Sequence, residues 1–232
     1  MKLTRLGTGI LVVSVTAAAA TGCGSNSAKD ASAPPQQTNC SQLTPKAPAK
    51  STENPPKTHL PSGNYSAIVK TNCGSFTIAL DTHNSPQSAA SFAKLARGSF
   101  YDGLIFHRIA PGFVIQGGDP LATGSGGPGY KTVELPPADA TYPRGTVAMA
   151  KTPIERPGTG GSQFFIVTGE DAGLPADYAI LGKVTSGLET VDRISNQELN
   201  PASVTGPAGA REGRPLQPVV IESITIKKRK SS

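Results

Sequence analysis

The chain has 232 residues with 22 basic and 16 acidic side chains, a formal net charge of +6, 26 glycines, 21 prolines and no tryptophan. This glycine and proline content favours short strands and many turns over a helical bundle. The positive charge is scattered apart from residues 227–230, and such a tail usually keeps a chain end soluble or lies near anionic lipid, so we expect no nucleic-acid partner.

The N-terminal residues 1–22 have the features of a lipoprotein signal peptide. Lys2 and Arg5 provide a basic start, and residues 6–20 are apolar or small but too few to span a bilayer. The small residues before Cys23 resemble a bacterial lipobox, in which cleavage leaves the cysteine to carry lipid. Because Ala20 stands where lipoboxes more often carry leucine, a conventional signal peptide with an incidental cysteine is the alternative. We expect an extracytoplasmic protein anchored to the cell membrane through lipid on Cys23.

The segment 23–62 is rich in proline, serine and alanine, and Leu43 and Leu60 are its only large aliphatic residues. Such a segment cannot bury enough apolar surface to offset its ordering entropy, so we predict a disordered linker. The rest of the chain has room for one domain, which we place at 63–227, followed by a basic tail at 228–232.

Two further cysteines follow Cys23 in the sequence, Cys40 in the linker and Cys73 in the domain. Paired thiols outside the cytoplasm tend to oxidise, so we predict a Cys40–Cys73 disulfide, with two free thiols as the alternative. Because most of the loop that this bond closes is linker, we expect it to stabilise the domain only slightly.

The domain is expected to consist of short strands and two helices. Alternating apolar residues predict a hairpin over 65–80, and Ser85, Pro86 and Gly98 are suited to the start and end of a helix. This helix presents one apolar face, formed by Ala89, Phe92, Leu95 and Ala96. Further strands are expected at 104–109, 113–116, 146–150, 163–168, 179–184 and 219–226, with a second helix at 188–194. The pattern leaves a sandwich or a barrel open, and favours an antiparallel barrel capped by helices.

The sequence contains no recognisable motif for several common classes of catalysis. The three histidines, His59, His83 and His107, are far apart and belong to no HExxH or Cys/His cluster, so we expect no metal. No nucleophile elbow or Ser/His/Asp set is apparent. The glycine-rich residues 124–129 lack the Gly-Lys-Ser/Thr ending of a phosphate loop and are predicted to form a mobile surface loop. We expect no cofactor.

Two segments carry the strongest signal: residues 106–119 read FHRIAPGFVIQGGD, and residues 161–166 read GSQFFI. With TVAMA at 146–150 and LGKV at 181–184, in this order and spacing, they resemble the signature of the cyclophilins, a family of peptidyl-prolyl cis/trans isomerases. The resemblance covers about residues 65–226. It implies a mainly β fold, an eight-stranded antiparallel barrel capped by two helices, with the active site on its outer face.

The resemblance also implies roles for individual residues. Arg108 takes the position of the catalytic arginine, and Phe113 and Gln116 complete the catalytic group. The residues expected to bind substrate are Val114, Ala150, Gln163, Phe165, Leu174 and Tyr178. Without the motif, Phe113 would be interpreted as core packing and Arg108 as part of a surface ion pair. We interpret His107 as a structural histidine whose hydrogen bonds are satisfied.

The sequence departs from the familiar family pattern at a few positions. Val114 stands where many members carry methionine, Gly173 where eukaryotic members usually carry tryptophan, and Tyr178 where they carry histidine. The segment 151–161 is longer than usual and is expected to reshape the substrate groove.

The expected function is therefore isomerisation of X-Pro bonds in exported proteins by a monomer that aids their folding. The alternative is a catalytically weak module of the cell envelope that binds proline-containing segments or acts as a holdase. The intact set of Arg108, Phe113 and Gln116 favours the enzyme.

Overall fold

The computed structural model describes residues 40–206 and 210–229, so the predicted signal peptide, Cys23 and the end of the basic tail lie outside the described residues. The elements follow one another as β1 (Tyr65–Thr71), β2 (Gly74–Leu80), α1 (Pro86–Arg97), β3 (Phe106–Ala110), β4 (Val114–Gly117), β5 (Thr132–Val133), β6 (Thr146–Met149), β7 (Thr159–Gly160), β8 (Phe164–Val167), β9 (Ile180–Ser186), α2 (Leu188–Ser195), a 3-10 turn at Pro201–Ser203, and β10 (Ile221–Lys228). None of the helices in these ranges is long and apolar enough to cross a membrane.

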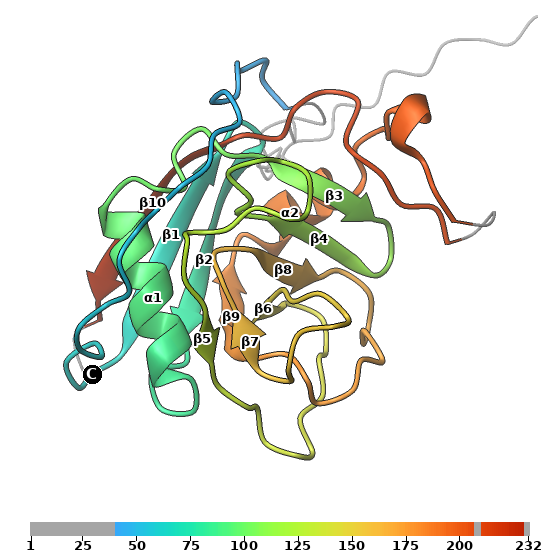
Figure 1. The fold of residues 1–232 in the computed structure, drawn as a ribbon. Helices are drawn as coiled ribbons and strands as arrows, with labels where there is room; N and C mark the ends of the chain where they lie inside the picture. Colours follow the sequence, from blue (N-terminus) through green and yellow to red (C-terminus); the bar gives the residue numbers. More distant parts are fainter. Residues whose placement is uncertain (1–39, 207–209, 230–232) are drawn as a thin grey trace, which may run out of the picture. The chain divides into compact units, whose positions relative to one another are not determined.

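Eight of the strands form one sheet in the order β10-β1-β2-β9-β6-β8-β4-β3, and every neighbouring pair is antiparallel (Figure 1). The sheet curls until its two ends meet. Phe106 N–H donates to the Val219 carbonyl at 2.9 Å, and Ile221 N–H donates to the Leu104 carbonyl at 2.8 Å. This contact decides between sandwich and barrel, and the predicted antiparallel barrel with two helices is confirmed.

Side chains alternate between the two faces of each strand, so one strand can contribute to two different apolar clusters. In β8, Phe164 and Ile166 belong to the main core, whereas Phe165 and Val167 belong to a second apolar cluster. The predicted helix face is buried against the main core, with all four residues at most 5% exposed: Ala89, Phe92, Leu95 and Ala96. The second cluster supplies the apolar surface of the site described below.

The start of α1 is stabilised by a distant residue. Ser85 occupies the N-cap position, but its side chain makes no capping hydrogen bond. Instead, the Glu134 carboxylate accepts hydrogen bonds from the N–H groups of Gln87 and Ser88 at 3.0 and 2.9 Å. Glu134 follows β5, one of two short strands that the sequence pattern did not predict. A carboxylate at this end also complements the helix dipole.

The structure differs from the predicted linker in residues 40–62, which have no regular secondary structure but pack along the domain. Figure 1 shows this segment in shades of blue, with its later, lighter part running past α1. Cys40 and Cys73 form a disulfide, with their Cα atoms 4.1 Å apart. Hydrogen bonds then attach the segment at five further places: Ser41 N–H to the Asn72 carbonyl, Lys46 N–H to Gly103, Ala49 N–H to Pro120, Glu53 N–H to Pro128, and Lys94 Nζ to Asn54. Residues 40–62 have the composition of a linker. They are ordered because they form hydrogen bonds to the domain, and such bonds cannot be inferred from composition.

Candidate active site

The second apolar cluster forms the floor of a cavity of about 330 Å³ on the outer face of the barrel. Eight of the nine catalytic and substrate-binding residues predicted from the sequence line it: Arg108, Phe113, Val114, Gln116, Ala150, Phe165, Leu174 and Tyr178. The ninth, Gln163, lines the neighbouring cavity. Residues that are far apart in the sequence therefore meet at one site.

The apolar part of this cavity, which we call the proline pocket, is positioned by β4 and β8. Val114 and Phe165 are 2% and 4% exposed and form its floor. Phe113 and Leu174 are only partly buried, so their side chains form walls that a ligand can contact. A concave, rigid apolar surface of this kind suits a compact apolar ring.

Arg108 lies at the rim of the pocket on β3, directly opposite Gln116 on β4. Its guanidinium carbon lies 5.8 Å from the centroid of the Phe113 ring, and its side chain is 30% exposed. Nη1 donates to Gln116 Oε1 at 3.3 Å, while Nε and Nη2 both donate to Glu212 Oε2, at 3.1 and 2.5 Å. The guanidinium is thus held on two sides.

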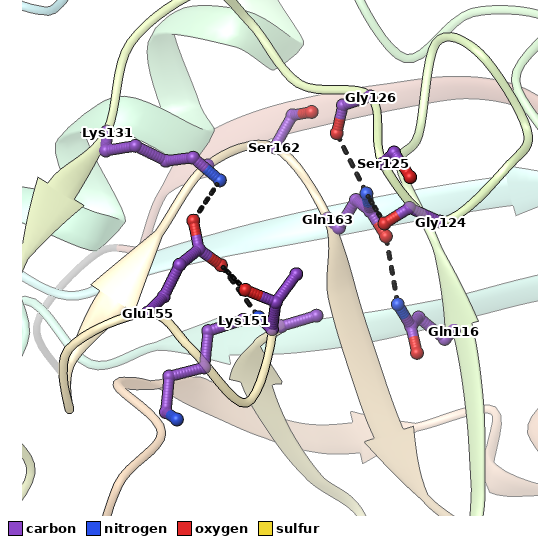
Figure 2. A pocket seen from close by; sticks show the side chains of 12 residues that line it. Gln116, Gly124, Ser125, Gly126, Lys131, Lys151, Glu155, Ser162 and Gln163 are labelled. Carbon is purple, nitrogen blue, oxygen red and sulfur yellow. Dashed lines mark hydrogen bonds and ion pairs between the residues drawn. The ribbon is translucent and has the colours of Figure 1, made fainter.

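A chain of hydrogen bonds fixes the glutamine orientations (Figure 2). Gln163 Nε2 donates to the carbonyls of Gly124 and Gly126 at 3.0 and 2.8 Å. Its Oε1 must therefore be the acceptor, and Gln116 Nε2 donates to it at 2.9 Å. Gln116 Oε1 is left to accept from Arg108. Each amide has one orientation that satisfies the whole chain.

The glycine-rich loop forms one end of this chain of hydrogen bonds and is held in place, in contrast to the predicted mobile loop. The Asp119 carboxylate accepts hydrogen bonds from the N–H groups of Leu121, Thr123 and Gly124. Burial acts to raise the pKa of Asp119, but these backbone hydrogen bonds outweigh it and lower the pKa. The loop thereby presents the carbonyls of Gly124 and Gly126 to Gln163.

A second cavity of about 290 Å³ adjoins the proline pocket, and Gln116, Ala150 and Lys151 line both. Figure 2 shows Lys131 and Glu155 joined in an ion pair on the side of this cavity opposite Gln116 and Gln163, with Nζ and Oε1 2.8 Å apart. Glu155 belongs to the segment 151–161, and its Oε2 also accepts hydrogen bonds from the N–H and hydroxyl of Thr152. This segment thus forms one wall of the cavity.

Two residues near the pocket were not predicted from the sequence. Tyr142 is fully buried, donates from its hydroxyl to the Tyr178 carbonyl at 2.8 Å, and accepts from the Tyr178 N–H at 3.0 Å. It thereby holds Tyr178, whose ring meets Phe165 edge-on at 5.5 Å. The Lys151 ammonium lies 5.1 Å from the centroid of the Tyr178 ring. Tyr142 belongs to no motif, so no sequence signal marked it. Gly173, at φ +60°, has open space where a side chain would lie, near the Tyr178 side of the pocket.

His107, next to Arg108, is 7% exposed, and within the described part of the chain neither ring nitrogen has a hydrogen-bond partner. The expectation of a satisfied structural histidine is therefore wrong. The pKa of His107 is lowered to about 4, mainly by burial and also by Arg214 and Arg108, while Asp119 opposes the shift. The ring is accordingly neutral at physiological pH.

We expect His107 to make the domain sensitive to acid. The unfolded chain has the ordinary histidine pKa of 6.5 and binds a proton at a higher pH than the folded chain, whose His107 pKa is about 4. Above pH 6.5 the ring is neutral in both states, and protonation of His107 does not reduce the free energy of unfolding. As the pH falls from 6.5 towards 4, the unfolded chain binds the proton first, and the free energy of unfolding decreases by about 3 kcal/mol.

Urea unfolding between pH 7 and pH 4 measures this dependence. The variant His107→Gln should flatten the pH slope in that interval, whereas His83→Gln, at an exposed histidine, should leave it unchanged. A slope that is the same in wild type and His107→Gln would contradict the assignment.

Within the described residues, no group of three or more His, Cys, Asp or Glu side chains is close enough to hold a metal ion. The arrangement is instead an apolar pocket with one guanidinium and two oriented amides at its rim. Such a site can hold an apolar ring and donate hydrogen bonds to a neighbouring atom, without a nucleophile.

The chain matches the family described as "Cyclophilin type peptidyl-prolyl cis-trans isomerase/CLD" over residues 66–226. It is 41% identical to a probable peptidyl-prolyl cis-trans isomerase A of Mycobacterium leprae, over 70% of this chain and 92% of the relative. It is 47% identical to peptidyl-prolyl cis-trans isomerase B of Bacillus subtilis, over 49% of this chain and 78% of the relative. A crystal structure of a Cryptosporidium parvum cyclophilin-type isomerase has a TM-score of 0.62 and 30% identity, covering 72% of this chain and 99% of that one.

The chain therefore belongs to the cyclophilin-type peptidyl-prolyl cis-trans isomerases. The enzyme class expected from the two sequence segments is confirmed.

Proposed function

We propose that this isomerase acts on X-Pro bonds of exported proteins, from a site in which Arg108 is the catalytic group and the proline ring occupies the proline pocket. One observation carries the assignment of the site: Arg108, held by Gln116 and Glu212, lies at the rim of an apolar pocket. A crystal structure of the Cryptosporidium parvum relative in the presence of the dipeptide Ala-Pro supports a proline-containing substrate for this chain as well.

The chemistry of the reaction explains why these residue types suit it. Resonance gives the peptide C–N bond a rotation barrier of about 18–20 kcal/mol. When the bond is twisted at the transition state, resonance is lost and the nitrogen lone pair becomes a hydrogen-bond acceptor. A guanidinium N–H near this nitrogen stabilises the twisted state more than either planar state, which is the condition for catalysis.

The stabilisation that one hydrogen bond supplies is too small for Arg108 to act alone. Reducing an uncatalysed step of about 100 s to about a millisecond requires roughly 7 kcal/mol of transition-state stabilisation. One hydrogen bond from a charged group supplies about 1.5–3 kcal/mol. The walls of the pocket must therefore supply the rest by holding the ring while the flanking carbonyl turns, and Phe113, Phe165 and Leu174 are placed to do so.

The exported location is supported by the cysteines. Disulfides persist in oxidising compartments, and Cys40 is bonded to Cys73. The sequence of residues 1–23 is typical of a lipoprotein signal, although it lies outside the described residues. The chain from Cys23 to Cys40 spans at most about 60 Å when fully extended. A domain anchored at Cys23 would therefore work close to the membrane surface.

We expect mass spectrometry of the mature wild-type protein to find Cys23 at its N-terminus, carrying diacylglycerol. Cys23→Ser should abolish the modification and release or misprocess the protein, because the thiol is the point of lipid attachment. A soluble wild-type form that is cleaved at another residue would contradict the anchor, and would leave the isomerase assignment untouched.

Catalysis itself is tested by a protease-coupled assay on an X-Pro peptide, followed by refolding of a protein whose slow step is proline isomerisation. An isomerase accelerates both. A module that only binds proline-containing segments accelerates neither, and that result would overturn the proposed catalytic role of the site.

A further inference from the structure

Glu212 reaches the active site from a segment that lies far from both signature motifs. The backbones of Thr205 and Glu212 exchange hydrogen bonds at 2.9 and 3.1 Å. The next residue, Gly213, exchanges hydrogen bonds with Ile109 of β3 at 2.8 and 3.0 Å. Because Ile109 follows Arg108 in the chain, this pairing fixes the backbone of Glu212 beside the catalytic arginine.

The contact between the two side chains is specific. Glu212 Oε2 accepts from both Nε and Nη2 of Arg108, while Nη1 donates to Gln116. A guanidinium has five N–H donors in a rigid plane, so three are engaged and one remains on each terminal nitrogen. The plane of the guanidinium is thereby set from two sides, by Glu212 and by Gln116.

Solvent exposure limits what this pair contributes to stability. The side chains of Arg108 and Glu212 are 30% and 36% exposed. Exposed ion pairs contribute little to the free energy of unfolding, because water screens the charges. The pair instead restricts a long side chain that would otherwise sample many rotamers, and a donor that is already ordered loses less freedom when the transition state forms.

We propose that Glu212 is a positioning residue that holds the Arg108 guanidinium in the orientation needed at the transition state. This inference rests on the proposed catalytic role of Arg108. Glu212 contributes through its hydrogen-bond acceptor oxygen, so an amide in its place retains much of the effect. Sequence reasoning did not mark Glu212, because it lies 104 residues from Arg108 and outside the motifs.

The test compares Glu212→Ala, Glu212→Gln, Arg108→Ala and the double variant of Arg108→Ala with Glu212→Ala, each with kcat and KM measured on one X-Pro peptide. Glu212→Ala should lower kcat about three- to tenfold and leave KM unchanged, since the ground-state pocket is intact. Glu212→Gln should regain at least half of the loss. The double variant should be no slower than Arg108→Ala, because Glu212 acts only through the arginine.

The matched control is Glu222→Ala. Glu222 has a similar exposure of 35% and pairs with Lys70 at 3.6 Å, and neither residue lines the proline pocket or the adjoining cavity. Its loss should leave kcat unchanged. Thermal unfolding of every variant verifies that the fold is retained.

The outcomes separate the two proposals. If Arg108→Ala keeps its activity, the proposed catalytic role of Arg108 fails. If Arg108→Ala loses activity, the positioning role of Glu212 is overturned by any of three results: wild-type kcat in Glu212→Ala, no recovery in Glu212→Gln, or a double variant slower than Arg108→Ala.

Discussion

Arg108→Ala is expected to reduce kcat/KM by about 10- to 150-fold, the equivalent of the 1.5–3 kcal/mol that a hydrogen bond from a charged group supplies. The effect should appear in kcat, because the guanidinium acts on the twisted bond rather than on the planar substrate. The proline pocket beneath it is built by Val114 and Phe165, which do not depend on Arg108 for their burial. The free energy of unfolding should therefore change little.

Arg108→Lys should also be slow, although it keeps the positive charge. An ammonium is compact and cannot donate to Glu212 and Gln116 and at the same time present an oriented N–H to the pocket. The protease-coupled assay measures both variants, and urea unfolding verifies the fold. An alanine variant with most of its activity intact would remove Arg108 from the mechanism.

Loss of the Cys40–Cys73 disulfide is expected to lower the free energy of unfolding by about 3–4 kcal/mol, the chain-entropy value for a closed loop of this length, with sequence separation 33. The sequence alone suggested a much smaller effect, because the loop was predicted to be disordered linker. Since residues 41–54 make hydrogen bonds to Asn72, Gly103, Pro120 and Pro128, the bond closes a loop that is ordered in the folded state. Its loss therefore weakens the attachment of this segment as well as freeing the unfolded chain.

Urea unfolding of the wild type with and without reductant measures this effect. Cys40→Ser is the matched variant, because it leaves the buried Cys73 in place. Its free energy of unfolding should equal that of the reduced wild type and should not respond to reductant. A change below about 1 kcal/mol would show that residues 40–62 stay attached through hydrogen bonds alone.

The features that could be predicted from the amino-acid sequence are those that repeat locally. Alternation predicted the β1–β2 hairpin, and the apolar face from Ala89 to Ala96 together with Pro86 and Gly98 predicted α1. Phe113, Val114 and Phe165 of the proline pocket were predicted because they lie within two short motifs whose order and spacing are specific to one family, and Leu174 was predicted from the wider resemblance to that family. These predictions agree with the structure because each depends only on consecutive residues and on the strand or helix that they form.

The features that join distant segments became known from the three-dimensional fold. The choice of barrel over sandwich depends on hydrogen bonds between residues 104–106 and 219–221. The cap of α1 comes from Glu134, the order of residues 40–62 from the carbonyls of remote loops, and the orientation of Arg108 from Glu212. His107, interpreted from its sequence context as satisfied, is instead buried without a partner among the described residues. A hydrogen bond between irregular segments leaves no periodic pattern in either one, so its partner becomes known only when the fold brings the two together.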